Sequence, residues 1–223
     1  GSTIGSYLAA LGFNVDFAPV ADVLTNPDNQ VIGQRSFGSD AQTVAGMVTS
    51  ELQGLSAAGV YGMVKHFPGH GGTSGDSHDG AVSTDKTLEE LMAEELVPFQ
   101  SAIDGGVNFV MVGHISAPNV TGDNAPATLS KVLITDVLRG QMGYNGIVIT
   151  DAMNMEAITG FYNSDKAAVL AVTAGADMIL MPADYNTAYT GILNAVNDGT
   201  ITEERINESV TRIVKAKLAM GQP

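Results

Sequence analysis

The densest group of residues that could carry acid–base chemistry lies in one glycine-rich stretch of the chain. Lys65-His66-Phe67-Pro68-Gly69-His70-Gly71 is followed by Asp76-Ser77-His78. An imidazole titrates near neutral pH, so it can donate a proton and later take one back. Neither G-x-G-x-x-G nor a Walker sequence follows a predicted strand, so a phosphate cradle is not indicated. The stretch therefore favours acid–base work.

A metal site is the alternative use of the same stretch. His66, His70, Asp76 and His78 carry ligand types that suit zinc, and the chain has no cysteine to add thiolate ligands. The H-x3-H spacing, however, spans Pro68-Gly69 and does not lie on a helix face, unlike an H-E-x-x-H site. We expect no metal and no organic cofactor, and loss of activity in chelator would indicate the metal-dependent alternative.

Polar side chains also stand where the predicted strands end. Asp22 follows the first strand, Lys65 and His66 close the second, His114 closes the third and Asp151 closes the fourth. Parallel strands carry functional residues at their carboxyl ends, because the βα loops meet there. One face of the predicted sheet therefore holds the site.

The elements that must position these residues alternate between strands and helices. Strands are expected at Asn14–Ala21, Val60–His66, Val107–His114, Gly146–Asp151 and Ala176–Met181, each nearly continuous in apolar residues. Helices are expected at Thr3–Leu11, Ala41–Ala58, Lys131–Met142, Asp165–Ala174, Asn186–Asp198 and Glu203–Met220. Another starts at about Leu88 with a Thr87/Glu90 capping box and continues its apolar face to Ile103.

Strands that alternate with helices predict an α/β fold with a parallel sheet, here a (β/α)8 TIM-barrel-like fold. Eight strands close such a barrel in about 250 residues, so we expect some N-terminal βα units to be missing. No linker or short repeat divides the chain, and residues 1–223 are expected to form a single domain.

Composition narrows the class of partner. The formal net charge is −14, which disfavours nucleic acid and anionic membrane surfaces but not a neutral ligand such as a sugar. No apolar run is long enough to span a membrane, and the first ten residues do not look like a signal peptide. The low lysine content with abundant Asn, Thr and Gly slightly favours an extracytoplasmic location.

The combination of KHFPGHG with a downstream DSH resembles glycoside hydrolase family 3, in its bacterial β-N-acetylglucosaminidase branch. The resemblance extends to FAPVADV at 17–23, VIGQRSFG at 31–38 and ITDAM at 149–153, in the family's order. It implies that Asp151 is the nucleophile of a retaining glycosidase, which forms a covalent glycosyl-enzyme. It also implies that His78 is the acid/base, with Asp76 as its partner.

The resemblance further assigns sugar-binding roles. Arg35, Lys65 and His66 match positions that hold sugar hydroxyls, and Asp22, His114 and Met153 are expected to line the site or support it. The chain departs from the family by lacking the earlier strand that bears an acidic sugar-binding residue followed by Gly-Gly and Arg. That departure leaves open whether this chain is active.

Each assignment has a structural alternative. Asp151 could cap the following helix, and Asp76 and His78 could be incidental polar residues of an exposed loop. Lys65 could pair with a carboxylate, Arg35 could be a surface residue, and Met153 could be a packing residue.

The predicted function is removal of terminal β-linked N-acetylglucosamine from peptidoglycan or chitin fragments. The alternatives are a β-glucosidase or xylosidase of the same family, or an inactive barrel fragment. Exposed sheet edges lead us to expect self-association or pairing with an N-terminal fragment.

Overall fold

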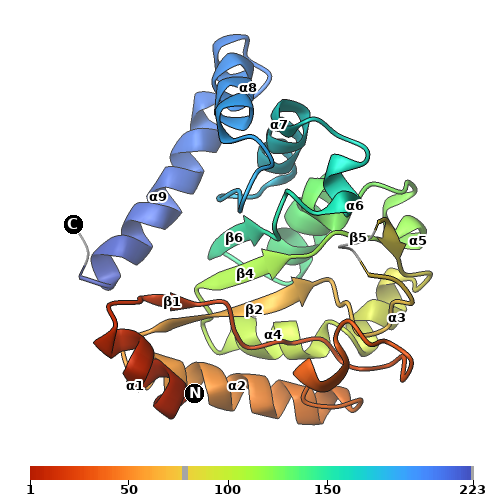
Figure 1. Cartoon of the computed structure of the whole chain (residues 1–223), viewed down its shortest axis with the longest axis vertical. Coiled ribbons are helices and arrows are strands. Elements are labelled where there is room, and N and C mark those ends of the chain that lie inside the picture. Colours follow the sequence, from red (N-terminus) through yellow and green to blue (C-terminus); the bar gives the residue numbers. More distant parts are fainter. Residues whose placement is uncertain (77–79, 222–223) are drawn as a thin grey trace.

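The computed structural model describes residues 1–76 and 80–221 and shows an α/β fold built on parallel strands (Figure 1). The strands are β1 (Val15–Asp16), β2 (Tyr61–Phe67), β3 (Val82–Ser83), β4 (Phe109–Val112), β5 (Ile115–Ser116) and β6 (Ile147–Thr150). The helices are α1 (Ser2–Ala10), α2 (Ala41–Ala57), α3 (Leu88–Ala93), α4 (Val97–Asp104), α5 (Pro118–Thr121), α6 (Glu156–Thr159), α7 (Ser164–Ala174), α8 (Tyr185–Asn197) and α9 (Glu203–Ala219). Shorter 3-10 turns cover Gly33–Arg35 and Ala127–Leu129, and Val132–Gln141 forms a π-helix.

The main sheet is parallel and has the order β1-β2-β4-β6. Beyond β6, Met178 forms a parallel bridge with Ile149, so the predicted fifth strand lies at the sheet edge. Strands that neighbour one another in the order of the sequence are the arrangement of a (β/α) barrel wall. The predicted fold class is confirmed, while β3 and β5 form a small second sheet that the sequence pattern did not predict.

All the predicted strands except Val60–His66 are shorter in the structure, and the first and the fifth, at the edges of the sheet, are shortened most. The first is regular only at Val15–Asp16, because Pro19 has no N–H to add to the ladder. The chain stays paired through other groups, since Met63 N–H donates to Ala18 O at 2.7 Å and Ala21 N–H to Lys65 O at 2.6 Å. At the other edge, Leu180 N–H donates to the hydroxyl of Thr150 instead of to a backbone carbonyl.

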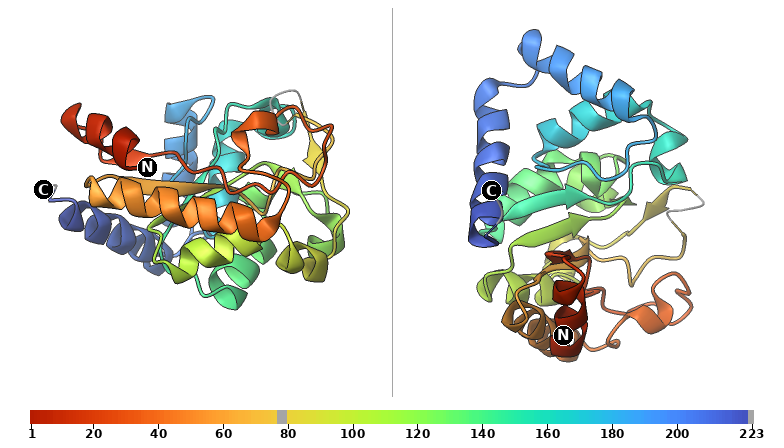
Figure 2. Two further views of the ribbon diagram at one scale, coloured as in Figure 1. Left: turned by 90° about the horizontal axis from the view of Figure 1, so that it is seen from below. Right: turned by 60° about the vertical axis from the view of Figure 1, so that its left-hand side comes forward.

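The side chains of the central strands alternate between two apolar layers. Met63, Phe109 and Ile147 belong to an inner cluster, against which Ile213 of α9 packs. Val64, Val110 and Val148 face the outer layer, where α2, α4 and the π-helix cover the sheet. Figure 2 shows α9 running along the side of the molecule beside β6.

The predicted helices are present apart from one, whereas the short helices α5 and α6 were not predicted. The predicted continuous helix from Leu88 to Ile103 is broken into α3 and α4. Pro98 lies in the first turn of α4, where its missing N–H costs nothing, whereas inside a continuous helix it would remove a hydrogen bond. The capping box between Thr87 and Glu90 is present as predicted.

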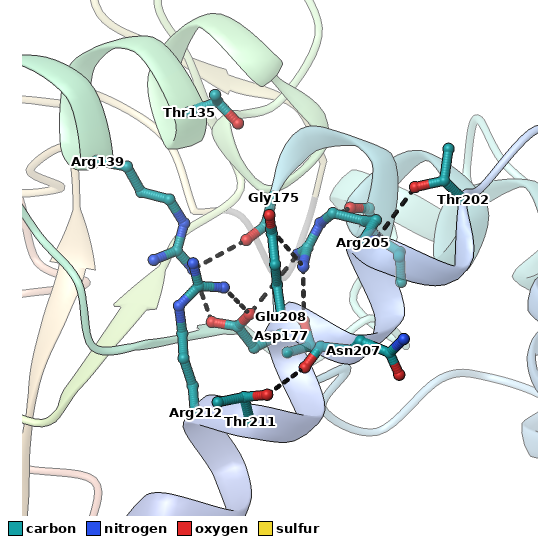
Figure 3. Close-up of polar contacts among 12 residues, drawn as sticks. Thr135, Arg139, Gly175, Asp177, Thr202, Arg205, Asn207, Glu208, Thr211 and Arg212 are labelled. Carbon is teal, nitrogen blue, oxygen red and sulfur yellow. Dashed lines mark hydrogen bonds and ion pairs between the residues drawn. The ribbon is translucent and has the colours of Figure 1, made fainter.

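A buried carboxylate joins three elements at the amino end of β6. Asp177 accepts from Arg139 at 2.6 Å, from Arg212 at 3.0 Å and from Ser209 at 2.6 Å (Figure 3). Its Oδ2 also accepts the N–H of Val148 at 2.9 Å. This cluster attaches the π-helix and α9 to the base of the sheet, at the end of β6 away from Asp151.

Within the described residues, no helix is both long and apolar enough to cross a membrane.

Candidate active site at the carboxyl ends of the strands

Asp151 follows the last residue of β6 and continues the inward alternation of Ile147 and Ile149. Its N–H donates to Val112 O at 2.8 Å, which fixes the strand end against β4. One carboxylate oxygen, Oδ1, accepts the N–H of Ala152 at 2.7 Å. Asp151 does not cap α6, whose N-cap is Met155. The carboxylate is half-buried and is oriented by the backbone of its own neighbour.

Lys65 lies on the same inward face, two residues after Met63 on β2. Burial and the nearby charge of Arg35 lower the pKa of Lys65, and the charges of Asp151, Asp16 and Asp22 oppose that shift. The ammonium group therefore shares one electrostatic environment with Asp151 and Arg35. Among the described residues Lys65 forms no ion pair, so the alternative of a direct pair with a carboxylate is not seen.

Asp22 and His66 form a buried polar pair at the site. The carboxylate of Asp22 is fully buried, and its Oδ2 lies 2.7 Å from Nδ1 of His66. Its Oδ1 accepts the backbone N–H groups of His66 and His70, at 3.2 and 2.7 Å. Burial alone would raise the pKa of Asp22, but the charge and hydrogen bonds of His66 and the His70 N–H lower it below its ordinary value. Asp22 is therefore an ionised support buried beneath His66.

The Asp22 contact determines which nitrogen of His66 faces the site. Nδ1 donates to the carboxylate, so Nε2 points the other way, 3.5 Å from Nη2 of Arg35. A guanidinium has only donors, so that contact is a hydrogen bond only when Nε2 carries no proton. Arg35 itself is exposed, and its Nη1 donates to Val31 O at 3.2 Å.

The first half of the glycine-rich loop is held by neighbouring side chains. Asn29 donates to the carbonyl oxygens of His70 and Thr73 at 2.8 and 3.0 Å, and Nδ1 of His70 lies 2.7 Å from the Thr73 hydroxyl. Burial lowers the pKa of His70, although the charge of Asp22 opposes this. Asp76 is half-buried farther along the loop. The predicted acid/base His78 lies outside the described residues.

Sequence reasoning missed Glu95, which lies at the break between α3 and α4 and is buried beneath this loop. Its Oε1 bonds to Lys86 and accepts from the Thr25 hydroxyl at 3.1 Å, while Oε2 is buried without a hydrogen-bond partner in the described part of the chain. A Cβ on Gly69 would come within 2.7 Å of the Glu95 Cβ. The available signal was its spacing, because a residue four positions after Leu91 and four before Phe99 lies on the apolar face of the predicted helix.

His114 and Met153 are both buried at the ends of their strands. Nε2 of His114 lies 3.0 Å from Ala152 O, and because a carbonyl can only accept, Nε2 is the donor. Nδ1 lies 2.8 Å from the buried Thr128 hydroxyl. Met153 packs in the main apolar cluster, and its N–H donates to Leu180 O at 2.9 Å. His114 thus braces the peptide that follows Asp151, and Met153 contributes packing.

The described residues contain no group of three or more His, Asp or Glu side chains arranged to hold a metal ion. The polar groups gathered at the strand ends are an open carboxylate, a lysine, an arginine and a buried histidine–aspartate pair. Such a set can attack an electrophilic carbon and donate hydrogen bonds to a polyhydroxylated ligand.

Comparison with known proteins places this arrangement in a family. Residues 1–216 match the family described as Glycosyl hydrolase family 3 N terminal domain. Beta-hexosaminidase A of Pseudoalteromonas piscicida is 34% identical over 241 residues, which cover 99% of this chain and 40% of that protein. Beta-hexosaminidase LpqI of Mycobacterium tuberculosis is 38% identical over 221 residues, which cover 96% of this chain and 56% of that protein.

A solved structure of a glycoside hydrolase family 3 β-N-acetylglucosaminidase from a Paenibacillus species has a TM-score of 0.96 and 45% identity, and covers 98% of this chain and 42% of that one. The chain thus spans about half or less of the length of these relatives. Because the family match covers residues 1–216 and the fold of the solved structure is shared, this chain belongs to glycosyl hydrolase family 3.

Proposed function

We propose that this chain supplies the catalytic face of a retaining β-N-acetylglucosaminidase, with Asp151 as the nucleophile. The observation that carries the proposal is the position of Asp151, on the inward face at the carboxyl end of β6 and within the electrostatic reach of Lys65. With Oδ1 held by the Ala152 N–H, Oδ2 is the oxygen that attacks the anomeric carbon. The bond from Oδ2 to that carbon forms as the glycosidic C–O bond breaks.

The leaving oxygen needs a proton, and we assign the donor to His78 with Asp76 as its partner. This assignment rests on the family resemblance of the Asp76-Ser77-His78 segment. In the second step the same imidazole takes a proton from water, and the hydroxide opens the glycosyl-enzyme with net retention of configuration.

Arg35, Lys65 and His66 are proposed to hold sugar hydroxyls. The Nε2 of His66 is aimed away from Asp22 and toward Arg35, so it can accept from or donate to a hydroxyl according to its protonation. Asp22 supports His66 by accepting its backbone N–H, and His114 supports the peptide that follows Asp151 by donating to Ala152 O. Met153 is given only a packing role in the wall.

The proposed substrate is a terminal β-linked N-acetylglucosamine of peptidoglycan or chitin fragments. The names of the relatives support this choice, since those cited above are two beta-hexosaminidases and a β-N-acetylglucosaminidase. We infer that residues 1–223 act as a single catalytic domain. A β-glucosidase is the second candidate, because a Cellulomonas fimi relative with 34% identity carries the name Beta-N-acetylglucosaminidase/beta-glucosidase.

The test compares Asp151→Asn with wild type in the full-length protein. The substrates are the nitrophenyl β-N-acetylglucosaminide and β-glucoside, and the readout is nitrophenol release. We expect wild type to prefer the acetylated sugar and the variant to lose about 10⁴-fold or more of kcat, since an amide cannot form the glycosyl-enzyme. Asp136→Asn, an exposed aspartate on the π-helix, is the matched control and should keep full activity.

The outcomes separate the alternatives. Preference for the glucoside would replace the proposed substrate, and equal activity of the Asp151 and Asp136 variants would remove Asp151 as nucleophile. We expect activity to persist in excess chelator, whereas its loss and recovery with zinc would favour the metal-dependent alternative.

A further inference from the structure

A pocket of about 490 Å³ opens beside the strand end that carries Asp151 and has no role in the function proposed above. Its walls are the end of β4 and β5, the connection at 123–126, and α6 with the residues that follow it. Figure 1 shows α6, β5 and α5 gathered on one side of the sheet. The volume suits a ligand of about the size of one or two sugar rings.

The pocket is tied directly to the peptide after the nucleophile. His114 lines it and donates through Nε2 to Ala152 O at 3.0 Å. Ala81, which comes soon after the loop bearing Asp76, lines the same pocket. Lys65 and Arg35, the proposed sugar-binding residues, belong to β2 and the segment before α2, and neither lines this pocket. The pocket therefore lies next to the peptide that follows Asp151, on the side of α6.

One wall of the pocket is aromatic and the opposite wall is polar. On one side Phe161 exposes 64% of its surface and Tyr162 is half-buried next to it. On the other side Asp123 and Asn124 are exposed, and their loop is held by the Ser116 hydroxyl, which donates to Asn124 O at 2.8 Å. An exposed aromatic ring beside a pocket offers a flat apolar face against which a ligand can pack.

A pyranose ring of N-acetylglucosamine also has apolar and polar parts, with C–H groups on its faces and hydroxyl and acetamido groups around its edge. We propose that this pocket is the leaving-group subsite, which takes the second sugar of a β-linked N-acetylglucosamine chain. In it Phe161 packs against the sugar face, while Asp123 and Asn124 meet its polar edge. This inference rests on the proposed function, because it needs Asp151 to define where the cleaved bond lies.

The experiment compares two substrates that differ only in the leaving group. Methyl β-N-acetylglucosaminide has a leaving group too small to reach Phe161, whereas N,N′-diacetylchitobiose has a sugar there. In the full-length protein, Phe161→Ala should lower kcat/KM for the disaccharide about fivefold to tenfold. It should leave kcat/KM for the methyl glycoside unchanged. Phe161→Tyr, which keeps the ring, should restore the disaccharide value.

Phe13→Ala is the matched control, since Phe13 is also an exposed ring, does not line this pocket, and precedes β1 at the sheet edge opposite β6. This control variant should keep the wild-type kcat/KM for both substrates. Equal loss on both substrates, or no loss on either, with an active wild type would overturn the subsite and leave the proposed function standing. A wild type that hydrolyses neither N-acetylglucosaminide would instead overturn the proposed function itself.

Discussion

At the scale of single residues, the carboxylate of Asp22 accepts three hydrogen bonds. The donors are Nδ1 of His66 and the backbone N–H groups of His66 and His70. An asparagine in its place presents one oxygen and one NH2, so a donor would face a donor. We predict that Asp22→Asn lowers kcat/KM about 10–100-fold, chiefly through KM, because His66 loses its orientation.

Steady-state kinetics on the nitrophenyl β-N-acetylglucosaminide would measure this effect. Asp28→Asn is the control, because Asp28 is exposed in the same segment of the chain. Should the two variants behave alike, Asp22 would not be a positioning residue for His66.

The sequence predicted which residues gather at the strand ends but not which of them touch. Asp22, Lys65, His66, His114 and Asp151 each follow or close an apolar run, and all lie at the carboxyl ends of the strands. The contact between Asp22 and His66 joins residues 44 positions apart. Local pattern carries no information on such a pair, since only the register of β1 against β2 brings it together.

At the scale of elements, the break between α3 and α4 places two neighbouring glutamates in opposite settings. Glu94 and Glu95 both bond to Lys86, but the side chain of Glu94 is 44% exposed and that of Glu95 only 2%. Burial alone would lower the pKa of Lys86, and the hydrogen bonds that it donates to these two carboxylates raise it. The buried member should therefore contribute more to stability.

We predict that Glu95→Gln lowers the free energy of unfolding by about 1–3 kcal/mol, because it weakens a buried charged hydrogen bond. Glu94→Gln removes a solvent-screened charge and should change the free energy of unfolding by less than about 1 kcal/mol. Urea unfolding followed by circular dichroism would measure both. Equal losses in the two variants would show that burial of Glu95 has no energetic consequence.

Helical periodicity did carry a signal for Glu95. An apolar face from Leu88 to Ile103 predicts one helix, and a glutamate four residues after Leu91 and four before Phe99 lies on that apolar face. Its hydrogen-bond partners could not be found in this way, because the break between α3 and α4 sets the direction of the side chain. The other predicted helices agree with the structure to within two residues at each end, because their apolar positions and caps agree, as Asp40 and Thr202 show by accepting N–H groups at the starts of α2 and α9.

At the scale of the whole molecule, the cluster around Asp177 joins the π-helix, α9 and the base of the sheet (Figure 3). Its side chain is fully buried and has three arginines around it. We predict that Asp177→Asn lowers the free energy of unfolding by about 3–5 kcal/mol, since the guanidinium groups lose their counter-charge. The exposed-site variant Asp136→Asn should differ little from wild type.

The loss of stability caused by Asp177→Asn should become smaller as the pH falls. Burial alone would raise the pKa of Asp177, but Arg139, Ser209 and the Val148 N–H hold it below its ordinary value of 3.8. The ionised carboxylate therefore stabilises the fold fully above about pH 3.8, and this contribution is lost as the pH falls through the lower folded pKa. The difference between wild type and Asp177→Asn should shrink in that range, and a difference that grows would contradict this account.

The predicted self-association, or pairing with an N-terminal fragment, stays a prediction. Large apolar side chains are exposed on and just after α1, at Tyr7, Leu11 and Phe13, and on α8 and α9, at Tyr189 and Leu218. The sequence indicated the parallel α/β fold from the alternation of its elements. It could not show which faces are left exposed, because exposure depends on how the elements pack.

The central claim, that Asp151 is the nucleophile of a retaining glycosidase, is tested most directly by trapping the intermediate. A slow fluorinated N-acetylglucosaminyl fluoride would be incubated with the full-length protein, and the labelled peptide identified by mass spectrometry. We predict one covalent sugar, attached within Ile149–Met153 at Asp151. A label on another carboxylate, or turnover that inverts the anomeric configuration without any adduct, would contradict the claim.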